Sequence, residues 1–528
     1  MKPSTGRLKR SRKLVSRLVG METEYATLVA NRKGLSTAEL PASGRLYARI
    51  CAAIRRDQPT VPGVFDRDQM FLASGGAVTF ESHPSLHALP GGLVEIATPE
   101  VRSPDELLAC QRSIDELVAD AAADATDRTD LRVLKNSTDA LGHVYGCQEN
   151  YEAVVATGIW LGIYRMCVAL LWVLQAVSLM ASLPVLALAF SPILLIRICR
   201  GSPSNRTASR PANDFEECVA GAESPGEIFE SLPGWIKAGL ITLLRVVHWP
   251  TVCVLRFVSR HVAFRKQRKY LTAMLVSRVS ICGAGDLDHD GRYRLSPKAM
   301  AIYVVADMGS YNGERPIYVY GHWLVQFCAK SFLSFGSTKA MFADRQRFQI
   351  GLSDSNVSDL AEYVKVGSVS LILDMIESGD TRDFVVLKKP IHALHEITTD
   401  WNLVRRVMTN RGRMSALELQ RGYLKAARRF VAETPMTNRG EADLVIQRWS
   451  DLLDVVVAFR RDAANVTPAL GRVDWLSKRW MIDQLGENAE WVNKKKVDLR
   501  YHELSSDGYH RKLVATNPSL RLIERRRI

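Results

Sequence analysis

Two glutamates one residue apart are the first residues of this chain whose types and spacing could do chemistry. Glu22 and Glu24 lie in "RLVGMETEY" (17–25), a run typical of a β-strand. In an extended chain residues i and i+2 point to the same face, about 7 Å apart, so the two carboxylates repel each other unless something positive lies between them. Mg²⁺, which binds oxygen ligands and is often shared with nucleotide phosphates, would suit that place. An edge strand with both acids in solvent is the alternative that the spacing alone favours.

Further acids follow in two clusters. In residues 71–100 a glycine turn leads to a short strand that ends at Glu81, and Glu95 comes after a loop. In residues 133–152 a strand and a polar turn lead to Gln148-Glu149-Asn150. Acids on three strand-like segments, with a lysine and asparagines among them, predict an antiparallel sheet that holds a magnesium-bound nucleotide.

The order of these segments resembles that of the proteasome accessory factor A family, which contains the Pup ligase and its relative Dop, the Pup deamidase and depupylase. The matching segments cover most of the chain outside one long apolar region. They are "GMETEY", "SGGAVTFE", "EIATPE", "LKNSTD", "YGCQENYE", "ICGAG", "LSDSNVSDLAEYVKVGSVSLILDMIESG", "RMSALELQRGYLKAA", "VDWLSKR" and "VDLRYHEL". The resemblance implies an α+β fold with an antiparallel sheet of the glutamine synthetase type.

The resemblance also implies an activity and a set of site residues. Family ligases use ATP and Mg²⁺ to phosphorylate the side-chain carboxylate of the C-terminal Glu of the modifier Pup, and a target lysine then displaces the phosphate. Glu81 stands at the position of the family's catalytic Asp. The implied metal ligands are Glu22, Glu24, Glu95 and Glu149. The implied nucleotide-binding residues are Arg347, Lys135, Asn136 and Asn150.

Three functions stay open. The short stretch between Tyr25 and Gly75 is similar to that of the ligases, so the resemblance favours joining of a Pup-like modifier to protein lysines. A deamidase or isopeptidase of the Dop type is the first alternative. The second is an inactive membrane-bound homologue, because Gln148 replaces a family histidine and a polar block expected after "RPI" (315–317) is missing.

A long apolar region interrupts the family pattern. Residues 154–196 contain one charge, Arg165, and are about twice as long as a bilayer crossing requires, so they predict a helical hairpin bent near residues 178–184. A buried soluble hairpin is the alternative. Residues 232–258 carry several cations and predict an amphipathic interfacial helix or a poor crossing. Basic flanks on both sides predict an even number of crossings and a catalytic domain on the cytoplasmic face of the inner membrane.

Composition predicts a large buried core, more than one domain and a reducing compartment. The chain has 528 residues, 47% hydrophobic and 24% charged, with a net charge of +14 that suits an acidic, disordered modifier. Nine scattered cysteines predict neither a disulfide framework nor a zinc site, and no signal peptide or nucleic-acid motif is apparent. The expected organisation is a basic tail (1–16), a first catalytic part (17–152), a membrane insert (153–270) with a polar linker at 200–217, and a second catalytic part (271–528) without the family's small C-terminal domain.

Overall fold

The computed structural model describes residues 13–30, 43–63, 69–81, 93–125, 130–200, 234–309, 315–326 and 334–523. These residues form two compact units. The first contains the described parts of 1–155, 264–320 and 345–528, and the second those of 156–263 and 321–344. Segment 321–344 therefore groups with the region that interrupts the family pattern, although it follows that region by about sixty residues.

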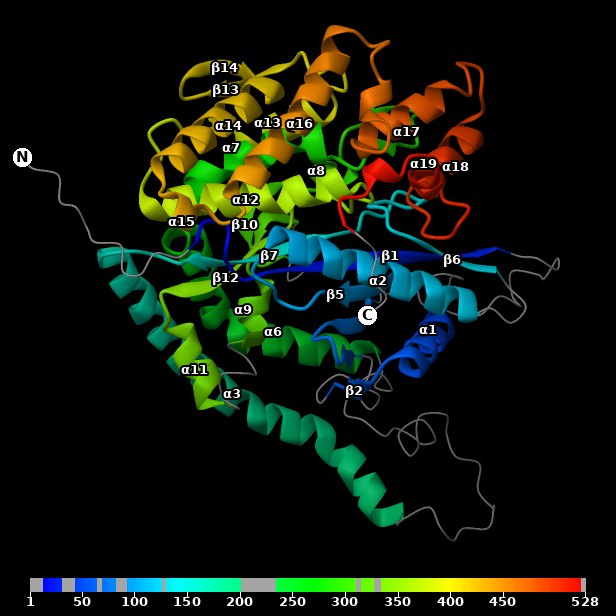
Figure 1. Ribbon diagram of the computed structural model, residues 1–528. Coiled ribbons are helices and arrows are strands. Elements are labelled where there is room, and N and C mark those ends of the chain that lie inside the picture. The colour runs from blue at the N-terminus through cyan, green and yellow to red at the C-terminus, as the bar shows by residue number, and fades with distance from the viewer. Residues whose placement is uncertain are drawn as a thin grey trace, which may run out of the picture. The chain divides into compact units, whose positions relative to one another are not determined.

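A ten-stranded sheet is the centre of the first unit, as far as that unit is described (Figure 1). The strands, in spatial order, are β10 (Val304–Asp307), β11 (Pro316–Val319), β12 (Arg345–Ile350), β7 (Gln148–Val154), β1 (Val19–Ala30), β5 (Leu93–Ala97), β4 (Ala77–Glu81), β3 (Met70–Leu72) and β2 (Thr60–Pro62), with β6 (Asp130–Leu134) paired to the far end of β1. All described pairs of this sheet are antiparallel except β10–β11, which is parallel. The predicted α+β class is therefore confirmed, and the sheet is mixed.

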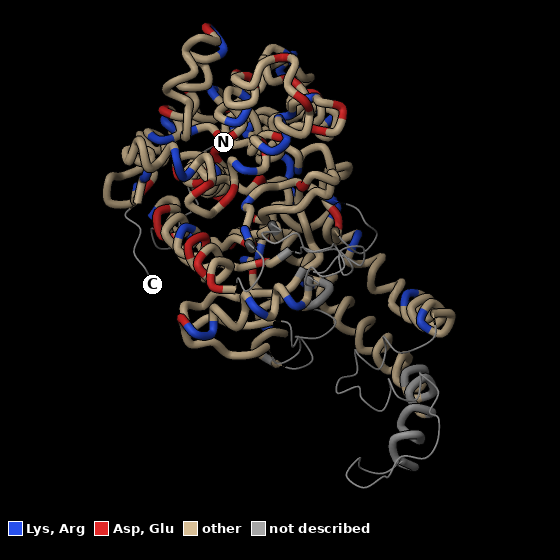
Figure 2. Tube along the Cα trace, turned by 90° about the vertical axis from the view of Figure 1, so that its right-hand side faces the viewer, with Lys and Arg blue, Asp and Glu red and all other residues tan. Residues whose placement is uncertain are grey.

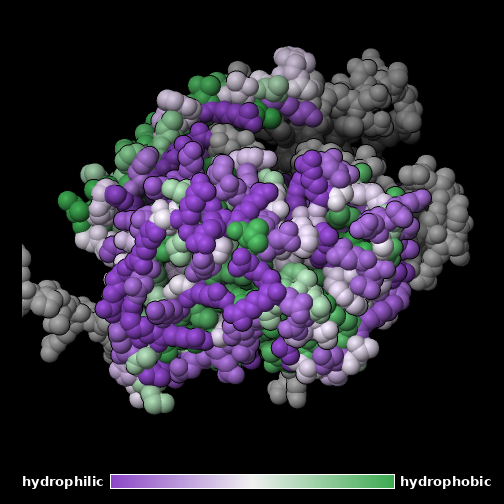
Figure 3. Space-filling model, turned by 90° about the horizontal axis from the view of Figure 1, so that it is seen from above, coloured by the Kyte–Doolittle hydropathy of each residue, from purple (hydrophilic) through white to green (hydrophobic). Residues whose placement is uncertain are grey.

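Helices cover one face of this sheet. They are α1 (Ser43–Asp57), α2 (Pro104–Asp124), α7 (Arg265–Cys282), α8 (Pro297–Met300), α12 (Asp359–Ser378), α13 (Pro390–Thr398), α14 (Ala416–Glu433), α15 (Met436–Arg439), α16 (Ala442–Arg461), α17 (Asp474–Asp483), α18 (Trp491–Tyr501) and α19 (Tyr509–Thr516), with the hairpins β8 (Asp286–Leu287)–β9 (Tyr293–Arg294) and β13 (Arg406–Thr409)–β14 (Gly412–Ser415). α12 is the most buried of them and contacts α2, α7, α14 and α16. Seen from above, this helical layer presents a mostly hydrophilic surface to solvent (Figure 3).

Local sequence explains where the main helices begin and end. Ser358 caps the start of α12 through its hydroxyl, and Gly379 ends the helix in the left-handed conformation that glycine tolerates best. α14 begins with a capping box in which Ser415 and Glu418 each accept a hydrogen bond from the other's backbone N–H. These caps fix the ends of two helices of the layer, of which α12 contacts β7 and α14 packs against α7 and α16.

The second unit is built around two long apolar helices. α3 (Ile159–Arg200) packs against α6 (Gly234–Phe257), which continues into a π-helical turn, η2 (Val258–Val262). The described residues also form α9 (Gly321–Val325) and α11 (Phe335–Met341). Tyr164 of α3 donates a hydrogen bond to the carbonyl of Met341 at 3.0 Å, which ties segment 321–344 to this unit.

The predicted hairpin within residues 154–196 is wrong. α3 continues as one helix of 42 residues through Pro184, and the Ser182 hydroxyl donates within the helix to the Ser178 carbonyl at 2.7 Å, so these polar residues do not form a turn. Its helical partner is α6: the Ser178 hydroxyl donates to the Val247 carbonyl at 3.1 Å, and Gln175 and His248 meet at 3.3 Å. The segments Ile159–Pro184 and Gly234–Val262 are each long and apolar enough to cross a bilayer, on length and composition alone. The part of α3 that is not drawn in grey in Figure 2 is nearly free of charged residues.

Candidate functional site

Four neighbouring strands bring the predicted acids together on the face of the sheet opposite the helices. In the ladder between β1 and β7, Glu22 lies opposite Gln148. In the ladder between β1 and β5, Glu24 lies opposite Glu95. Directly opposed residues share a face, so these four side chains lie on the same surface. Strand alternation and pairing therefore place Glu22, Glu24 and Glu95 on one face of the sheet.

Strand β12 completes this surface with a cation and an amide. Arg347 donates from Nε to Oδ1 of Asn150 at 2.8 Å and from Nη2 to Oε1 of Glu22 at 2.5 Å. Gln349 donates from Nε2 to Oε2 of Glu22 at 2.9 Å and to Oε1 of Gln148 at 2.6 Å. We call these five residues, Glu22, Gln148, Asn150, Arg347 and Gln349, the polar array. It places Arg347 and Asn150 beside the acids, as predicted for nucleotide-binding residues.

Glu24 and Glu95 form a second group next to the polar array. Glu24 is only 9% exposed and accepts a hydrogen bond from the backbone N–H of Gly146 at 3.0 Å. Its Oε1 and the carboxylate of Glu95 are hard oxygen donors on one face, the chemistry that Mg²⁺ prefers. Among the described residues, however, no cluster of three or more histidine, cysteine, aspartate or glutamate side chains is already arranged as a metal centre.

Glu149 does not belong to this surface. It lies between Gln148 and Asn150 on β7, so its side chain points to the opposite face, where it is 1% exposed. Arg278 of α7 binds both of its oxygens, at 2.7 and 3.0 Å, and Tyr151 donates a further hydrogen bond to it. Burial would raise the pKa of Glu149, but Arg278 outweighs it, and the pKa is lowered. The geometry does not support Glu149 as a ligand of a metal held by Glu24 and Glu95.

Lys135 and Asn136 are also held away from the polar array. Lys135 is fully buried and forms an ion pair with Asp115 of α2 at 3.1 Å, on the helix-covered side. Burial lowers the pKa of Lys135, and Asp115 opposes that effect. Asn136 accepts a hydrogen bond from Tyr145 and donates one to the carbonyl of Thr138, so both the oxygen and the nitrogen of its amide have partners close by in the chain. Both residues have structural partners in place of a nucleotide.

The side chain of Glu81 lies outside the described part of the structure, so only its backbone can be located relative to the site. Its backbone ends β4 and pairs with Leu93 of β5. Thr79, two residues earlier, lies opposite Glu95 in the same ladder. The strand that carries Glu81 is therefore next to the strand that carries Glu95.

Gln349 is a residue of the site that the sequence motifs did not indicate. It lies two positions after Arg347 on β12, so strand alternation places both on one face. The signal was available, since any strand assigned to "RQRFQI" brings Gln349 to the same side as Arg347. Gln349 is 5% exposed, and its hydrogen bond to Gln148 gives the residue at the family's histidine position a defined partner.

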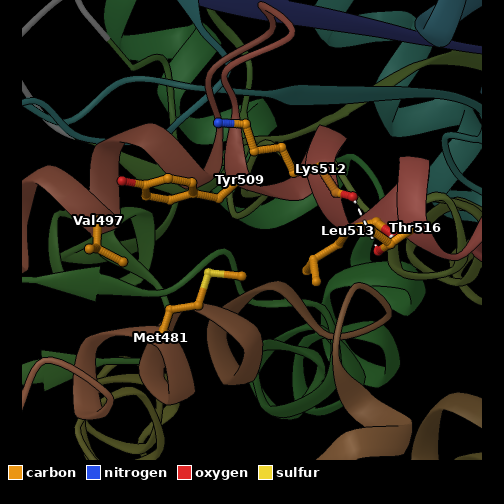
Figure 4. Close-up of a pocket in the computed structure, with 6 residues that line it drawn as sticks. All are labelled: Met481, Val497, Tyr509, Lys512, Leu513 and Thr516. Carbon is orange, nitrogen blue, oxygen red and sulfur yellow. Dashed lines mark hydrogen bonds between the residues drawn. The ribbon is translucent and has the colours of Figure 1, made fainter.

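An apolar cavity of about 370 Å³ lies elsewhere in the first unit (Figure 4). It is lined by Met481, Val497, Tyr509, Lys512, Leu513 and Thr516, which come from α17, α18 and α19. The Thr516 hydroxyl is used in a hydrogen bond to the Leu513 carbonyl at 2.9 Å. No carboxylate lines this cavity, so it offers no metal ligands and is not the candidate site.

Nearly the whole chain is similar to one protein family. The family model described as "Pup-ligase protein" matches residues 17–528. A Pup deamidase/depupylase from Mycolicibacterium smegmatis is 27% identical over 284 residues, which are 51% of this chain and 52% of that protein. The chain thus matches about half the length of this curated relative.

Two solved structures share the fold. The crystal structure of the complex between the prokaryotic ubiquitin-like protein Pup and its ligase PafA has a TM-score of 0.59 at 17% identity, over 97% of this chain and 78% of that one. The structure of the Pup ligase PafA in complex with ADP has a TM-score of 0.52 at 17% identity, over 93% of this chain and 80% of that one. At this identity the likeness shows a common fold.

Proposed function

The chain belongs to the Pup-ligase protein family, and from this premise we propose that it is an ATP- and Mg²⁺-dependent carboxylate–amine ligase. It would join the C-terminal Glu of an acidic, Pup-like modifier to protein lysines. The observation that carries the proposal is the polar array beside Glu24 and Glu95, which combines an arginine with hard oxygen ligands. These residues lie on the face of the sheet opposite the helical layer of the first unit, and we call this side the open face. The relatives with this fold were solved with Pup and with ADP.

The residues present suit the proposed nucleotide. Glu24 and Glu95 are the candidate Mg²⁺ ligands, because two carboxylates match the charge and the oxygen preference of that ion. Arg347 has a side chain that is 39% exposed, so it can reach a phosphate while Asn150 holds its Nε. When bound, ATP supplies the phosphoryl group and Mg²⁺ offsets its charge. Glu81 is proposed to accept a proton from the attacking lysine amine.

Hydrolysis is the second candidate function. The curated relative is a Pup deamidase/depupylase, and the match to it covers 284 residues. The same face could orient a water toward an amide or isopeptide bond of the modifier, with Glu81 as the base. An inactive homologue that binds nucleotide or modifier remains the third candidate, because Gln148 supplies an amide where the family pattern has a histidine.

We also propose that the second unit anchors the enzyme to a membrane. On α3 the residues turned inward include Gln175, Ser178 and Ser182, all buried. Apart from Arg165 and some small residues, the exposed residues of this part of α3 are large and apolar: Ile159, Trp160, Met166, Leu170, Trp172, Val173, Val177, Met180 and Leu183. Because the polar residues are inside and the apolar residues are outside, this helix pair suits a lipid environment better than an aqueous one.

Two crossings, by α3 and α6, would leave the ends of this unit's longer segment (156–263) on the same side of the membrane, proposed to be cytoplasmic. An interfacial position is the alternative for α6, which carries Lys237, Arg245 and Arg256. Extraction of membranes with alkaline carbonate tests the anchor as a whole. Spanning helices keep the protein in the pellet, whereas a unit that lies only on the membrane surface is released into the supernatant.

The enzymatic proposal is tested by incubating the detergent-solubilised chain with ATP, Mg²⁺, a Pup-like modifier ending in Glu and a lysine-containing protein. A ligase forms the conjugate and releases ADP and phosphate in equal amounts. Cleavage of a preformed conjugate without ATP turnover would instead establish the hydrolase. Failure of both reactions, together with absence of nucleotide binding, would contradict both enzymatic functions.

A further inference from the structure

The two glutamates that open the catalytic fold have different partners. Both carboxylate oxygens of Glu22 are engaged by donors from β12, Oε1 by Arg347 and Oε2 by Gln349. Within the described residues, Glu24 accepts one hydrogen bond, from the backbone N–H of Gly146 at Oε2, and it lies opposite a second acid, Glu95. The two residues share one strand face about 7 Å apart, so each meets a different neighbouring strand at its own level.

We propose that Glu22 is a positioning residue for Arg347 and Gln349 and does not ligate the metal. This inference deepens the proposed function and rests on it. Glu22 and Asn150 bind Nη2 and Nε of Arg347, which are the two nitrogens on one edge of the guanidinium group. Within the described residues no hydrogen bond is made by Nη1, so the opposite edge faces away from the pair. A guanidinium group that is held along one edge is already ordered, so its other edge can bind a phosphate without a further loss of side-chain entropy.

Charge supports the same division of roles. Glu22 and Arg347 form an ion pair, so together they contribute no net charge to the surface. Glu24 and Glu95 are the two further carboxylates on this face, and a pair of carboxylates suits the charge of one divalent cation. A metal bound to Glu22 would have to compete with Arg347 for one oxygen and with Gln349 for the other.

Gln349 gives this arrangement its second support. Its Nε2 bridges Glu22 on β1 and Gln148 on β7, at 2.9 and 2.6 Å. Because the amide is almost fully buried, it fixes the plane of the Glu22 carboxylate, and that plane determines where Arg347 can bind. The side-chain oxygen of Gln148 accepts the hydrogen bond from Gln349. At this position an amide therefore supports Gln349, where the family pattern has a histidine.

The test separates metal binding from nucleotide binding in the detergent-solubilised full chain. Mn²⁺ affinity is measured without nucleotide by electron paramagnetic resonance, and ATP affinity with Mg²⁺ by calorimetry. The variants are Glu22→Gln, Arg347→Gln, the double variant, and Glu95→Gln as the reference for a true ligand. Glu152→Gln is the matched control, because it removes a carboxylate opposite Arg347 in the β12–β7 ladder without touching Glu22.

The proposal predicts that Glu22→Gln leaves Mn²⁺ affinity within about twofold of the original chain and weakens ATP about tenfold. Arg347→Gln weakens ATP at least as much, and the double variant is no weaker than Arg347→Gln, since Glu22 acts through Arg347. Glu95→Gln loses Mn²⁺ binding, and Glu152→Gln changes neither affinity by more than about twofold.

Loss of Mn²⁺ binding in Glu22→Gln, comparable to that in Glu95→Gln, would overturn the proposal and make Glu22 a ligand. Multiplicative losses of ATP affinity in the double variant would also overturn it. If the original chain binds Mn²⁺ but no ATP, the nucleotide function fails on its own, and the Mn²⁺ comparison still decides the role of Glu22. If it binds neither, the proposed function and this assignment fall together.

Discussion

The two faces of strands β1 and β7 use charged residues in opposite ways. On the helix-covered face, Glu149 is buried against Arg278, and Asp115 is buried against Lys135 and Arg112. On the open face, Glu24 and Gln349 are buried, but the other residues of the polar array and Glu95 remain partly accessible. On the helix-covered face the charged residues form buried ion pairs that stabilise the packing of helices and strands. On the open face hydrogen-bond donors and acceptors remain available to a ligand. Neighbouring residues of one strand therefore have unrelated functions.

The largest expected effect on stability comes from breaking the buried face. Glu149→Ala would leave Arg278 buried without its carboxylate, and removal of one partner of a buried pair costs about 3–5 kcal/mol. Chemical denaturation of the solubilised chain measures the change in unfolding free energy. On the open face, Glu22→Gln is the matched comparison and should cost less than about 1 kcal/mol. Equal costs for the two variants would erase the contrast between the faces.

The next effect concerns binding on the open face. Substitution of Glu95 by Gln removes one of the two opposed carboxylates without changing the shape of the side chain, so Mg²⁺-dependent ATP affinity should fall at least about tenfold. Stability should change little, because Glu95 is partly exposed. Calorimetry and thermal unfolding on the same sample give both values. Unaltered ATP affinity would remove Glu95 from the metal site.

Acid should weaken the buried face in a defined pH range. Burial would raise the pKa of Asp115, but Lys135 and Arg112 outweigh it and lower the pKa from 3.8 to about 2. Since the unfolded chain then binds the proton more tightly, the stability that Asp115 contributes is present above about pH 4. It is lost as the pH falls toward 2, and the shift corresponds to about 2 kcal/mol. Denaturation curves between pH 2 and 6 measure it. Asp115→Asn should flatten that dependence, and a curve parallel to that of the original chain would contradict the assignment.

The smallest effect on stability is expected from Asn150→Ala. Asn150 is only partly buried and its amide binds Arg347 near the surface, so unfolding free energy should change by no more than about 0.5 kcal/mol. ATP affinity should nevertheless fall a few-fold, because Arg347 loses the acceptor of its Nε. Thermal unfolding and calorimetry again separate the two. A stability loss without a change in affinity would place Asn150 with the structural residues.

Strand alternation explains which parts of the site could be predicted. Glu22 and Glu24 share a face because they are two residues apart, and Arg347 and Gln349 share one for the same reason. Glu149 and Asn150 are adjacent in one strand, so the rule allows only one of them at the site. The motif order had suggested both. Which of the two faces the site depends on which side of the strand α7 covers. Arg278 of α7, 129 residues away in the chain, binds Glu149 and so assigns Glu149 to the covered side.

Long-range contacts also account for the parts of the fold that could not be predicted. The order of motifs was enough to indicate the sheet and the α+β class. The family resemblance implied Lys135 as a nucleotide-binding residue, yet its partner Asp115 lies on a helix twenty residues earlier. The pairing of α3 with α6 depends on contacts such as that of Gln175 with His248, which no local pattern reveals.

Binding of ATP to the intact, detergent-solubilised chain, measured by calorimetry with and without Mg²⁺, tests the central claim most directly. The open face should bind one ATP only when Mg²⁺ is present, and Glu24→Gln with Glu95→Gln should abolish that binding while the protein stays folded. Absence of binding in the intact chain, or binding that survives in the double variant, would contradict the claim that this face of the sheet is a nucleotide site.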